Sequence, residues 1–383
     1  MKVLSISSDR NIFKEGSAVR ARMVQYGTLF EEMHVVVFST RAGNKKTQIA
    51  KNVWVYPTNS WTRWLYIFDA IRIGRSIVKG QLSKAKDWVL TAQDPFECGL
   101  VAEKLARWFN LPLHIQIHTD FLNPYFATSS FLNRIRVRIA KKVLSRANAI
   151  RVVSQRIKGS LLQTKNYQLR TVPTVLPIFT DLEKFKTTEP SFSLQEKYAP
   201  WGFIILIVAR LSREKNISFS LDVLRELLKK YPKIGLVIVG EGPERENLEL
   251  RIKNYELGEN VVFEGWQEDL VSYYKTANLF LQTSLYEGFG LSLLEAVASG
   301  CPAVSSDVGI APELLTHKGH SFVCPVNDLS CFVSKISELI ENNQLRTFVS
   351  TQIDPDAAWQ FTQAKEGYLK AYKESIESAL SQA

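Results

Sequence analysis

The sequence has 383 residues, of which 45% are hydrophobic and 22% are charged, an ordinary globular composition with enough chain for two domains. No run of about 18 apolar residues occurs, so no stretch is predicted to span a membrane. The formal net charge of +10 favours anionic partners, namely nucleotides, phospholipid surfaces or nucleic acid; nucleic acid is the least favoured, because RNA-reading aromatic segments and helix-turn-helix spacing are missing.

The first half of the chain alternates short apolar runs with longer helical patterns. The runs predicted to be strands are 3–6, 35–38, 53–56, 88–90, 113–117 and 149–153. This is the βα alternation of a doubly wound sheet. Asp9 and Arg10 end the first run too early for a signal peptide, so we expect a cytoplasmic protein.

Polar side chains follow two of these predicted strands at their carboxyl ends. His118 and Asp120 follow one strand, and Asp94 follows another. A histidine in this place can face a cleft or be a hydrogen-bonded structural residue, Asp120 can bind an acceptor or start a turn, and Asp94 can line the rim or cap a helix. His114 lies about 13 Å from His118 by strand rise, so we expect no metal shared by the two.

Two segments of this half combine aromatic and basic residues. The first has Trp61, Trp64, Tyr66 and Phe68 followed by Arg72, Arg75 and Lys79. The second, 131–146, carries six cations and no acid. Such faces suit anionic lipid and predict peripheral contact with the inner face of the cytoplasmic membrane, although a solvated basic helix would have the same pattern.

The four cysteines, Cys98, Cys301, Cys324 and Cys331, have no paired short spacing. The sequence therefore predicts neither a disulfide framework nor a zinc site, and we expect four thiols in the core.

Between 173 and 200 the pattern weakens and four prolines interrupt a polar segment, which indicates a domain junction. A fully apolar strand, 203–208, restarts the alternation and is followed by Arg210 and Lys215, just before a helix that begins near Asn216. Two cations beside a helix amino terminus form a predicted diphosphate site. The next buried strand, 236–239, ends at Gly240 and Glu241, where a glycine lets backbone approach a ligand.

The stretch 278–305 combines a strand, a glycine-rich loop, a short apolar helix that Gly300 ends, and a second strand. Glu287 precedes the helix by about one turn, and Glu295 lies among its apolar residues. The first can accept from ligand hydroxyls or complement the helix dipole; the second needs hydrogen-bond donors or a position at the helix edge. The helix amino end attracts phosphate oxygens, so the pair predicts a ligand with many hydroxyls and an anionic group.

Glu287 and Glu295, seven residues apart within Glu-Gly-Phe-Gly-Leu-Ser-Leu-Leu-Glu-Ala, resemble the Glu-x7-Glu signature of the retaining nucleotide-sugar glycosyltransferases of family four, glycosyl transferases group 1. The loop after 203–208 is similar to the family's Gly-Arg-Leu…Lys-Gly element, with Ala209 and Asn216 in place of the two glycines. The resemblance implies the GT-B architecture: two facing doubly wound, Rossmann-like parallel-sheet domains with a crossover helix at the carboxyl end. The chain departs from the family at the loop 7–20, where a single glycine, Gly16, replaces a pair.

The resemblance also implies roles for individual residues. His118, Arg210, Lys215 and Glu287 are the predicted catalytic residues, with Glu295 on the ribose hydroxyls of the nucleotide. Asp94 and Asp120 are predicted on the acceptor side from their positions after two strands, not from the resemblance. The predicted donor-binding set is Gly16, Arg210, Lys215, Gly240, Glu241, Glu287, Gly288, Phe289, Gly290, Leu291 and Glu295. Neither a metal nor another cofactor is expected.

The sequence thus predicts an acceptor-side domain at 1–175, a linker at 176–200, a nucleotide-sugar domain at 201–350 and a helix within 351–383 that packs back on the first domain, with the active site between the domains. The predicted reaction moves a hexose from a UDP- or GDP-linked donor to a hydroxyl of a glycan or lipid-linked acceptor, in polysaccharide or glycolipid synthesis. Two alternatives remain open at this point: a sugar-nucleotide epimerase of the same architecture, and a non-catalytic protein that binds sugar nucleotides or lipid.

Overall fold

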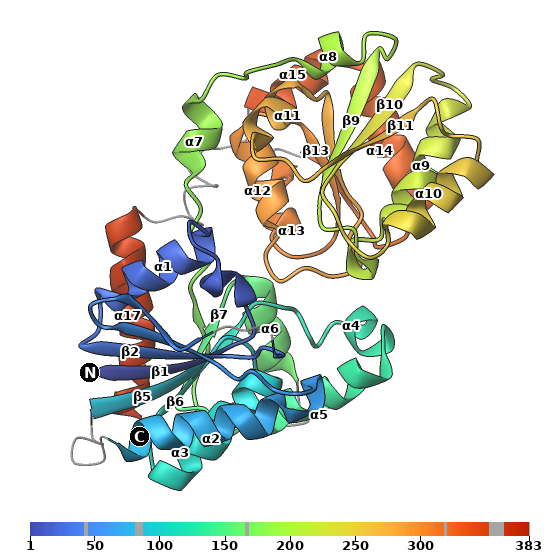
Figure 1. Cartoon of the computed structure of the whole chain (residues 1–383). Coiled ribbons are helices and arrows are strands. Elements are labelled where there is room, and N and C mark those ends of the chain that lie inside the picture. The colour runs from blue at the N-terminus through green and yellow to red at the C-terminus, as the bar shows by residue number, and fades with distance from the viewer. Residues whose placement is uncertain (42–44, 81–86, 165–167, 318–319, 352–363, 383) are drawn as a thin grey trace. The chain divides into compact units, whose positions relative to one another are not determined.

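The computed structural model describes the chain except for residues 42–44, 81–86, 165–167, 318–319, 352–363 and 383. It divides into two compact units, one formed by Met1–Pro177 with Ala364–Ala383 and the other by Ile178–Gln363. Each unit is built on one mainly parallel sheet with helices around it (Figure 1). The last helix therefore belongs to the first unit, although it follows the second in sequence.

The sheet of the first unit has the strand order β3-β4-β2-β1-β5-β6-β7-β8, and every pairing is parallel except that of β3 with β4. The central strands are buried along their length, because helices cover both faces of the sheet. The strands are β1 (Lys2–Ser7), β2 (Glu32–Val37), β3 (Thr47–Ala50), β4 (Val53–Pro57), β5 (Trp88–Ala92), β6 (Leu113–Ile117), β7 (Ala149–Val152) and β8 (Thr174–Val175).

Helices α2, α3 and α5 pack side by side on one face of this sheet, and α17 packs against β5, β6 and β7 on the other (Figure 1). The helices of the unit, with two short 3-10 turns, are η1 (Arg10–Phe13), α1 (Ala18–Gly27), η2 (Arg63–Leu65), α2 (Tyr66–Lys79), α3 (Glu97–Phe109), α4 (Pro124–Thr128), α5 (Phe131–Leu144), α6 (Gln155–Gln163) and α17 (Lys365–Ser381).

The sheet of the second unit has the order β11-β10-β9-β12-β13-β16 and is parallel throughout. Its strands are β9 (Phe203–Val208), β10 (Ile234–Val239), β11 (Val261–Gly265), β12 (Leu279–Gln282), β13 (Ala303–Ser306) and β16 (Val323–Cys324), and a separate hairpin pairs β14 (Thr316–His317) with β15 (His320–Ser321). The helices are α7 (Leu182–Thr187), α8 (Leu194–Lys197), η4 (Arg213–Lys215), α9 (Ile217–Leu228), α10 (Arg245–Asn254), α11 (Leu270–Thr276), α12 (Leu291–Ala298), α13 (Ala311–Leu314), α14 (Leu329–Glu341) and α15 (Asn343–Thr351). The prediction of two doubly wound parallel sheets is confirmed.

The segment 176–200, predicted as a linker, contains α7 and α8 and lies almost entirely in the second unit. The backbone N–H of Ser191 donates to the hydroxyl of Ser272 at 2.7 Å, and that of Leu194 donates to Thr276 at 3.1 Å. These bonds hold the polar, proline-interrupted segment against α11. The sequence did not predict this contact, because the segment has a weak apolar pattern and the two bonds are donated by backbone N–H groups. At the other end, α17 packs on the first unit, and the stretch 352–363 before it lies outside the described residues.

The cysteine prediction was wrong for one pair. Cys324 ends β16 and Cys331 lies in the first turn of α14, and they form a disulfide with a Cα–Cα distance of 5.8 Å. Asp328 caps α14 by accepting from the N–H of Cys331 at 3.0 Å, which turns the chain back on itself between the two residues. Cys98 and Cys301 are buried thiols, as expected.

Among the described residues, no helix has the length and apolarity that crossing a bilayer requires.

Candidate active site

The predicted diphosphate loop and the glycine-rich loop meet at the carboxyl edge of the second sheet. Strands β9 and β12 are parallel neighbours, so the segments that follow them, 209–216 and 283–290, leave the same edge. The carbonyl of Glu214 accepts from the N–H of Leu285 at 2.8 Å, and the hydroxyl of Thr283 donates to the carbonyl of Asn216 at 3.2 Å. These bonds join the two loops around a small pocket lined by residues that include Ala209, Lys215, Gln282, Ser284, Glu287 and Ser292.

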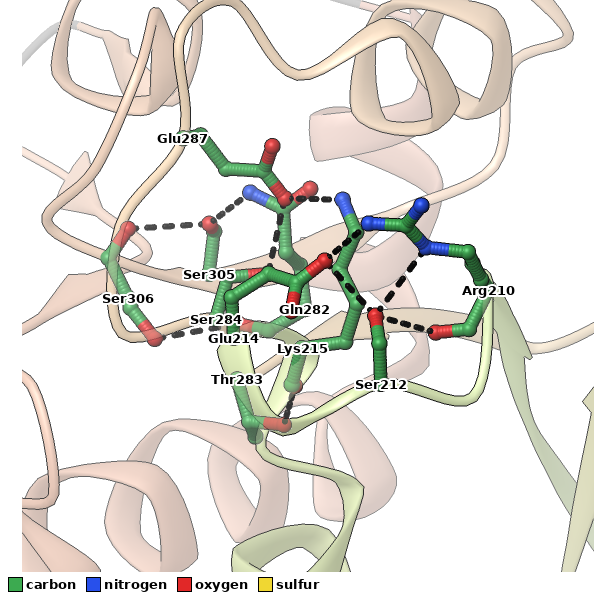
Figure 2. A network of polar contacts seen from close by, with 10 residues as sticks. All are labelled: Arg210, Ser212, Glu214, Lys215, Gln282, Thr283, Ser284, Glu287, Ser305 and Ser306. Atoms are coloured by element: carbon green, nitrogen blue, oxygen red, sulfur yellow. Dashed lines mark hydrogen bonds and ion pairs between the residues drawn. The ribbon is translucent and has the colours of Figure 1, made fainter. Parts of the chain in front are cut away.

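The centre of this pocket is an ion pair between Lys215 and Glu287. The Lys215 Nζ lies 2.5 Å from the Glu287 Oε1, and the hydroxyl of Ser284 donates to the same oxygen at 2.8 Å (Figure 2). The Lys215 side chain is 23% exposed and the Glu287 side chain 12% exposed, so the pair is shielded from water on most sides. Two residues 72 positions apart in sequence are thus brought together, as the prediction of a shared site requires.

Arg210 forms a second pair in the same loop. Its Nη2 donates to Glu214 Oε1 at 2.5 Å, and the hydroxyl of Ser212 donates to the same carboxylate oxygen at 2.7 Å (Figure 2). Burial raises the pKa of Glu214, but the hydrogen bonds from Ser212 and Arg210 outweigh burial and hold the pKa below its usual value. The Arg210 side chain is largely exposed, so its guanidinium can reach a ligand at this edge.

The backbone of both loops takes conformations that suit their residues. Asn216 has φ +52° and lies immediately before α9, so it adopts the left-handed conformation that we expected of a residue replacing a glycine. Gly290 has φ +107° and precedes α12, where the first amide groups of a helix lack partners within the helix. Phe289 is buried, and its carbonyl accepts from the N–H of Ile310 at 2.9 Å. Gly288 and Leu291 complete the turn, so the predicted donor loop is a fixed strand-to-helix connection.

Glu295 lies apart from the Lys215–Glu287 pair. Its carboxylate accepts from the hydroxyl of Tyr274 at 3.1 Å. Burial raises the pKa of Glu295 to about 7, against the opposing effects of the Tyr274 hydrogen bond and the positive charge of Lys184. Ser292, three residues earlier on α12, lines the pocket, so Glu295 is one helical turn from it.

Gly240 and Glu241 lie on the same edge, after β10. Gly240 has φ +130°, and a Cβ atom there would lie 2.0 Å from the carbonyl oxygen of Ala209. The glycine is therefore required by the close approach of two backbone segments, which is a packing reason independent of any ligand. The carbonyl of Glu241 accepts from the N–H of Leu211 at 3.0 Å, and its side chain is exposed.

The remaining predicted residues are in the first unit. His118 follows β6, and burial together with the charges of Arg151 and Arg22 lowers its pKa to about 3, so the imidazole is neutral at pH 7. Asp120 is buried, and burial raises its pKa despite the positive charge of Arg156. These two groups keep the places at the strand end that the sequence predicted.

Asp94 and Gly16 have local structural roles in the first unit. The Asp94 carboxylate accepts from the N–H of Phe96 at 2.8 Å and from that of Cys98 at 3.3 Å, so it caps α3, the second of the two roles that we left open. Gly16 has φ +74°, and no atom lies within 4 Å of the position of its missing Cβ.

Sequence reasoning missed several polar residues that surround the Lys215–Glu287 pair. Gln282 is buried at the end of β12, and its amide donates to the hydroxyl of Ser305 at 3.0 Å (Figure 2). Ser212 and Ser284 bond the two carboxylates described above. Gln282 and Ser284 lie at or just after the end of an apolar strand, and Ser212 lies in the loop after another, but such positions do not indicate which partners the side chains contact.

Among the described residues, no group of three or more His, Cys, Asp or Glu side chains is arranged to hold a metal ion.

Known proteins are similar to this region and to most of the chain. Residues 195–352 match the family model described as "Glycosyl transferases group 1". An alpha-monoglucosyldiacylglycerol synthase of Streptococcus pneumoniae is 26% identical over 309 residues, which cover 73% of this chain and 69% of that protein. An Escherichia coli UDP-Gal:alpha-D-GlcNAc-diphosphoundecaprenol alpha-1,3-galactosyltransferase is 26% identical over 178 residues, 45% of this chain and 46% of that protein.

Two solved structures show the same fold over the full length of both chains. Anabaena HepE in complex with UDP has a TM-score of 0.74 at 20% identity, and the sucrose-phosphate synthase of Thermosynechococcus elongatus has a TM-score of 0.79 at 18% identity. At these identities the likeness concerns the fold alone.

Proposed function

Because the chain belongs to the glycosyl transferases group 1 family and has the GT-B fold, we propose that it is a retaining, metal-independent hexosyltransferase. It moves a hexose from a UDP- or GDP-linked donor to a hydroxyl of a glycan or lipid-linked acceptor. The observation that carries the proposal is the shielded pair of Lys215 and Glu287 at the carboxyl edge of the second sheet, beside the amino end of α12.

In this proposal the cations stabilise the leaving nucleotide diphosphate. Negative charge develops on the phosphate oxygens as the bond to the sugar breaks, and a fixed ammonium and guanidinium lower the energy of that state. Lys215 and Arg210 come from one loop and precede α9, and the amino end of α12 adds its amide groups. These groups supply positive charge from the chain itself, which is why we propose a reaction without a metal.

The carboxylates recognise hydroxyl groups. Glu287 accepts from the hydroxyls of the sugar, together with the backbone at Phe289 and Gly290, and Glu295 accepts from the ribose. His118, neutral at pH 7, serves near the reacting carbon, with Asp120 on the acceptor side. By analogy with the family, departure and attack occur on the same face of the sugar, and the leaving phosphate helps to deprotonate the acceptor.

Names of relatives support the choice of donor and acceptor. UDP is bound in the HepE structure, and the E. coli relative is named for a UDP-Gal donor and a diphosphoundecaprenol acceptor. The S. pneumoniae relative is named for the synthesis of a glycolipid. We therefore place a UDP-linked hexose ahead of a GDP-linked one, and polysaccharide or glycolipid synthesis as the setting.

The test is acceptor-dependent turnover by the purified chain. UDP- and GDP-hexoses are first screened by thermal shift, since a ligand at about 100 times its dissociation constant adds roughly 2.7 kcal/mol to stability. The donor that stabilises is then incubated with diacylglycerol or a polyprenyl-diphosphate glycan, with and without EDTA, and nucleotide diphosphate release and the product anomer are measured. We expect release only with acceptor, an α-linked product from an α-linked donor, and no effect of EDTA.

A matched pair of variants locates the site. Lys215→Ala should lower kcat by about 100-fold or more, in the range found for a lost charge-stabilising donor. Lys229→Ala removes a lysine from an exposed pair with Glu226 in the same unit and should leave kcat unchanged. Conversion of the donor without any acceptor would instead indicate an epimerase, and an undiminished kcat in Lys215→Ala would contradict the role given to Lys215.

A further inference from the structure

Two helices of the first unit present the same outward pattern of one aromatic residue followed by three cations. On α2 the exposed aromatic and basic residues are Phe68, Arg72, Arg75 and Lys79, and on α5 they are Phe131, Arg134, Arg138 and Lys142, beside the exposed Leu132. In each helix these positions are three or four apart, so each set forms one stripe along the helix. The buried side of α2 packs against α3 and β2, and the buried side of α5 packs against α3 and α4.

Large aromatic side chains are exposed at the amino ends of these helices. Trp61 is 71% exposed, Trp64 83%, Phe68 68% and Phe131 74%. Leaving a side chain of this size in water forfeits the free energy that burial would give, and a cluster of them on one face indicates an interaction surface. Arg41 stacks on the ring of Trp61, with its guanidinium carbon 3.5 Å from the ring centre, so cation and aromatic are already combined there.

The two stripes belong to one face. Helices α2, α3 and α5 each lead into a parallel strand of the sheet, so their amino ends lie at the carboxyl edge of the strands and their aromatic ends point the same way. Helix α3 packs against both, which separates the α2 and α5 axes by roughly 16–20 Å. Arg75 reaches across to Trp108 of α3, with 5.6 Å from its guanidinium carbon to the ring centre.

The face is strongly basic. Segments η2 and α2 carry four cations and one carboxylate, α3 two of each, and α5 five cations and no carboxylate, a formal charge of +8 against +10 for the whole chain. Each of the three carboxylates is paired: Asp69 with Arg72, Glu97 with Arg136, and Glu103 with Arg146. The exposed cations Arg134, Arg138 and Lys142 therefore dominate the charge that a partner would meet.

We propose that this α2–α3–α5 face is a docking surface for an anionic lipid bilayer. Tryptophan and phenylalanine side chains enter the interfacial layer of a bilayer, and arginine and lysine side chains beside them bind anionic headgroups. A surface about 20 Å across with aromatic residues at one edge and cationic stripes along it combines both contributions. A protein or nucleic acid partner would need charge complementarity but not a row of exposed rings at one edge.

Co-sedimentation of the whole chain with vesicles tests the proposal. Vesicles of phosphatidylcholine alone are compared with vesicles that contain about one third phosphatidylglycerol, at physiological ionic strength. We expect at least tenfold tighter binding to the anionic vesicles, and weaker binding at about 1 M salt, where charges are screened beyond roughly 3 Å. A short RNA or DNA duplex competes as a separate arm and should not displace the protein from the vesicles.

Two double variants and two matched controls locate the surface. Arg138→Gln with Lys142→Gln should weaken vesicle binding about 30-fold, because each cation near an anionic membrane surface contributes about 1 kcal/mol to binding. Trp64→Ser with Phe131→Ser should weaken binding at least tenfold. The controls are Lys229→Gln with Lys253→Gln, and Trp266→Ser, which change exposed residues of the same types in the second unit. They should bind as the unmodified chain does.

Each other outcome overturns the proposal. The proposal is wrong if the protein is recovered equally with both kinds of vesicle or with neither. It is also wrong if nucleic acid displaces the protein from the vesicles, or if the control variants lose as much binding as the variants of this face. Thermal unfolding of every variant is measured alongside, and because all the substituted side chains are exposed we expect unchanged melting temperatures. A well-folded double variant that still binds as tightly as the unmodified chain would also exclude the proposed surface.

Discussion

A double-mutant cycle on Lys215 and Glu287 tests whether the site is a shielded ion pair. Lys215→Met keeps the length and apolar stem of the side chain but leaves the Glu287 carboxylate, 12% exposed, with its hydrogen bond from Ser284 and without the ammonium. Removing one partner of a fully buried pair costs about 3–5 kcal/mol, and because Lys215 is 23% exposed we expect about 1–3 kcal/mol here. Glu287→Gln should cost less, because an unpaired ammonium reaches water more easily.

The cycle is completed with the double variant, and stability is measured by urea unfolding with and without the nucleotide that binds. We expect a coupling of about 1–2 kcal/mol between the two residues, equivalent to roughly 2–8 °C in melting temperature for a unit of this size. The matched control is the pair of Lys229 and Glu226, also a lysine and a glutamate, 2.7 Å apart but with the lysine 67% exposed. Its coupling should stay near 0.3–0.5 kcal/mol, as for exposed helical pairs.

A coupling at Lys215 and Glu287 no larger than that of the control would refute the reasoning, because it would mean that solvent screens the pair. The increase in stability on adding nucleotide provides a second test. If Lys215 binds the diphosphate, the stabilisation by nucleotide should be smaller in Lys215→Met than in the unmodified chain and unchanged in Lys229→Met. Equal stabilisation by nucleotide in both variants would show that Lys215 does not bind the phosphates.

Three further predictions concern single positions. Burial raises the pKa of Glu295 from 4.5 to about 7, so the native state keeps this proton to a higher pH than the unfolded state does. The free energy of unfolding should therefore fall by up to about 3 kcal/mol between pH 4.5 and 7. Urea titrations at pH 5 and 8 should show this loss in the unmodified chain and not in Glu295→Gln. Arg151 is 2% exposed, and its guanidinium donates hydrogen bonds to the carbonyl groups of Leu176 and Pro177, the amide oxygen of Gln116 and the hydroxyl of Tyr368. Arg151→Met should therefore destabilise the first unit by about 3 kcal/mol in the same assay. A methyl group at Gly240 would lie 2.0 Å from a carbonyl oxygen whereas one at Gly16 meets open space, so Gly240→Ala should cost several kcal/mol and Gly16→Ala only about 1 kcal/mol.

The sequence predicted the elements whose apolar residues decide their structure. Strand β9, with six apolar residues in a row, was predicted to the residue, and Gly300 ends α12 with φ +78°, as a glycine at a helix end should. The two-residue strands β8 and β16 were missed, because two residues give no period to detect. They form because the backbone of each pairs with a neighbouring strand, β8 with β7 and β16 with β13. This pairing depends on the folded sheet and cannot be seen in the local sequence.

The structure places the predicted residues Lys215 and Glu287 in contact, but their polar neighbours Ser284 and Gln282 were not among the predicted residues. Lys215 and Glu287 could be matched because each stands beside a helix start at the end of a buried strand. Ser284 and Gln282 could not, because a serine or glutamine at a strand end is compatible with a turn, a cap or a core hydrogen bond. The disulfide of Cys324 and Cys331 was missed for a related reason: whether two cysteines seven residues apart meet depends on how the chain turns between them.

The pairing of each cation with a carboxylate has a consequence for the proposed reaction. Lys215 is held by Glu287 and Arg210 by Glu214, so the free site carries little net charge despite its two cations. In the proposed reaction, a diphosphate that binds Lys215 takes the ammonium from Glu287, and the released carboxylate keeps only the hydrogen bond from Ser284, so it needs further donors in its shielded position. The hydroxyls of the transferred sugar are such donors in the proposed reaction, and the free nucleotide lacks that sugar. If the proposed function holds, we therefore expect the pair to favour the intact nucleotide sugar over the free nucleotide, which would help the product nucleotide to leave once the sugar has been transferred.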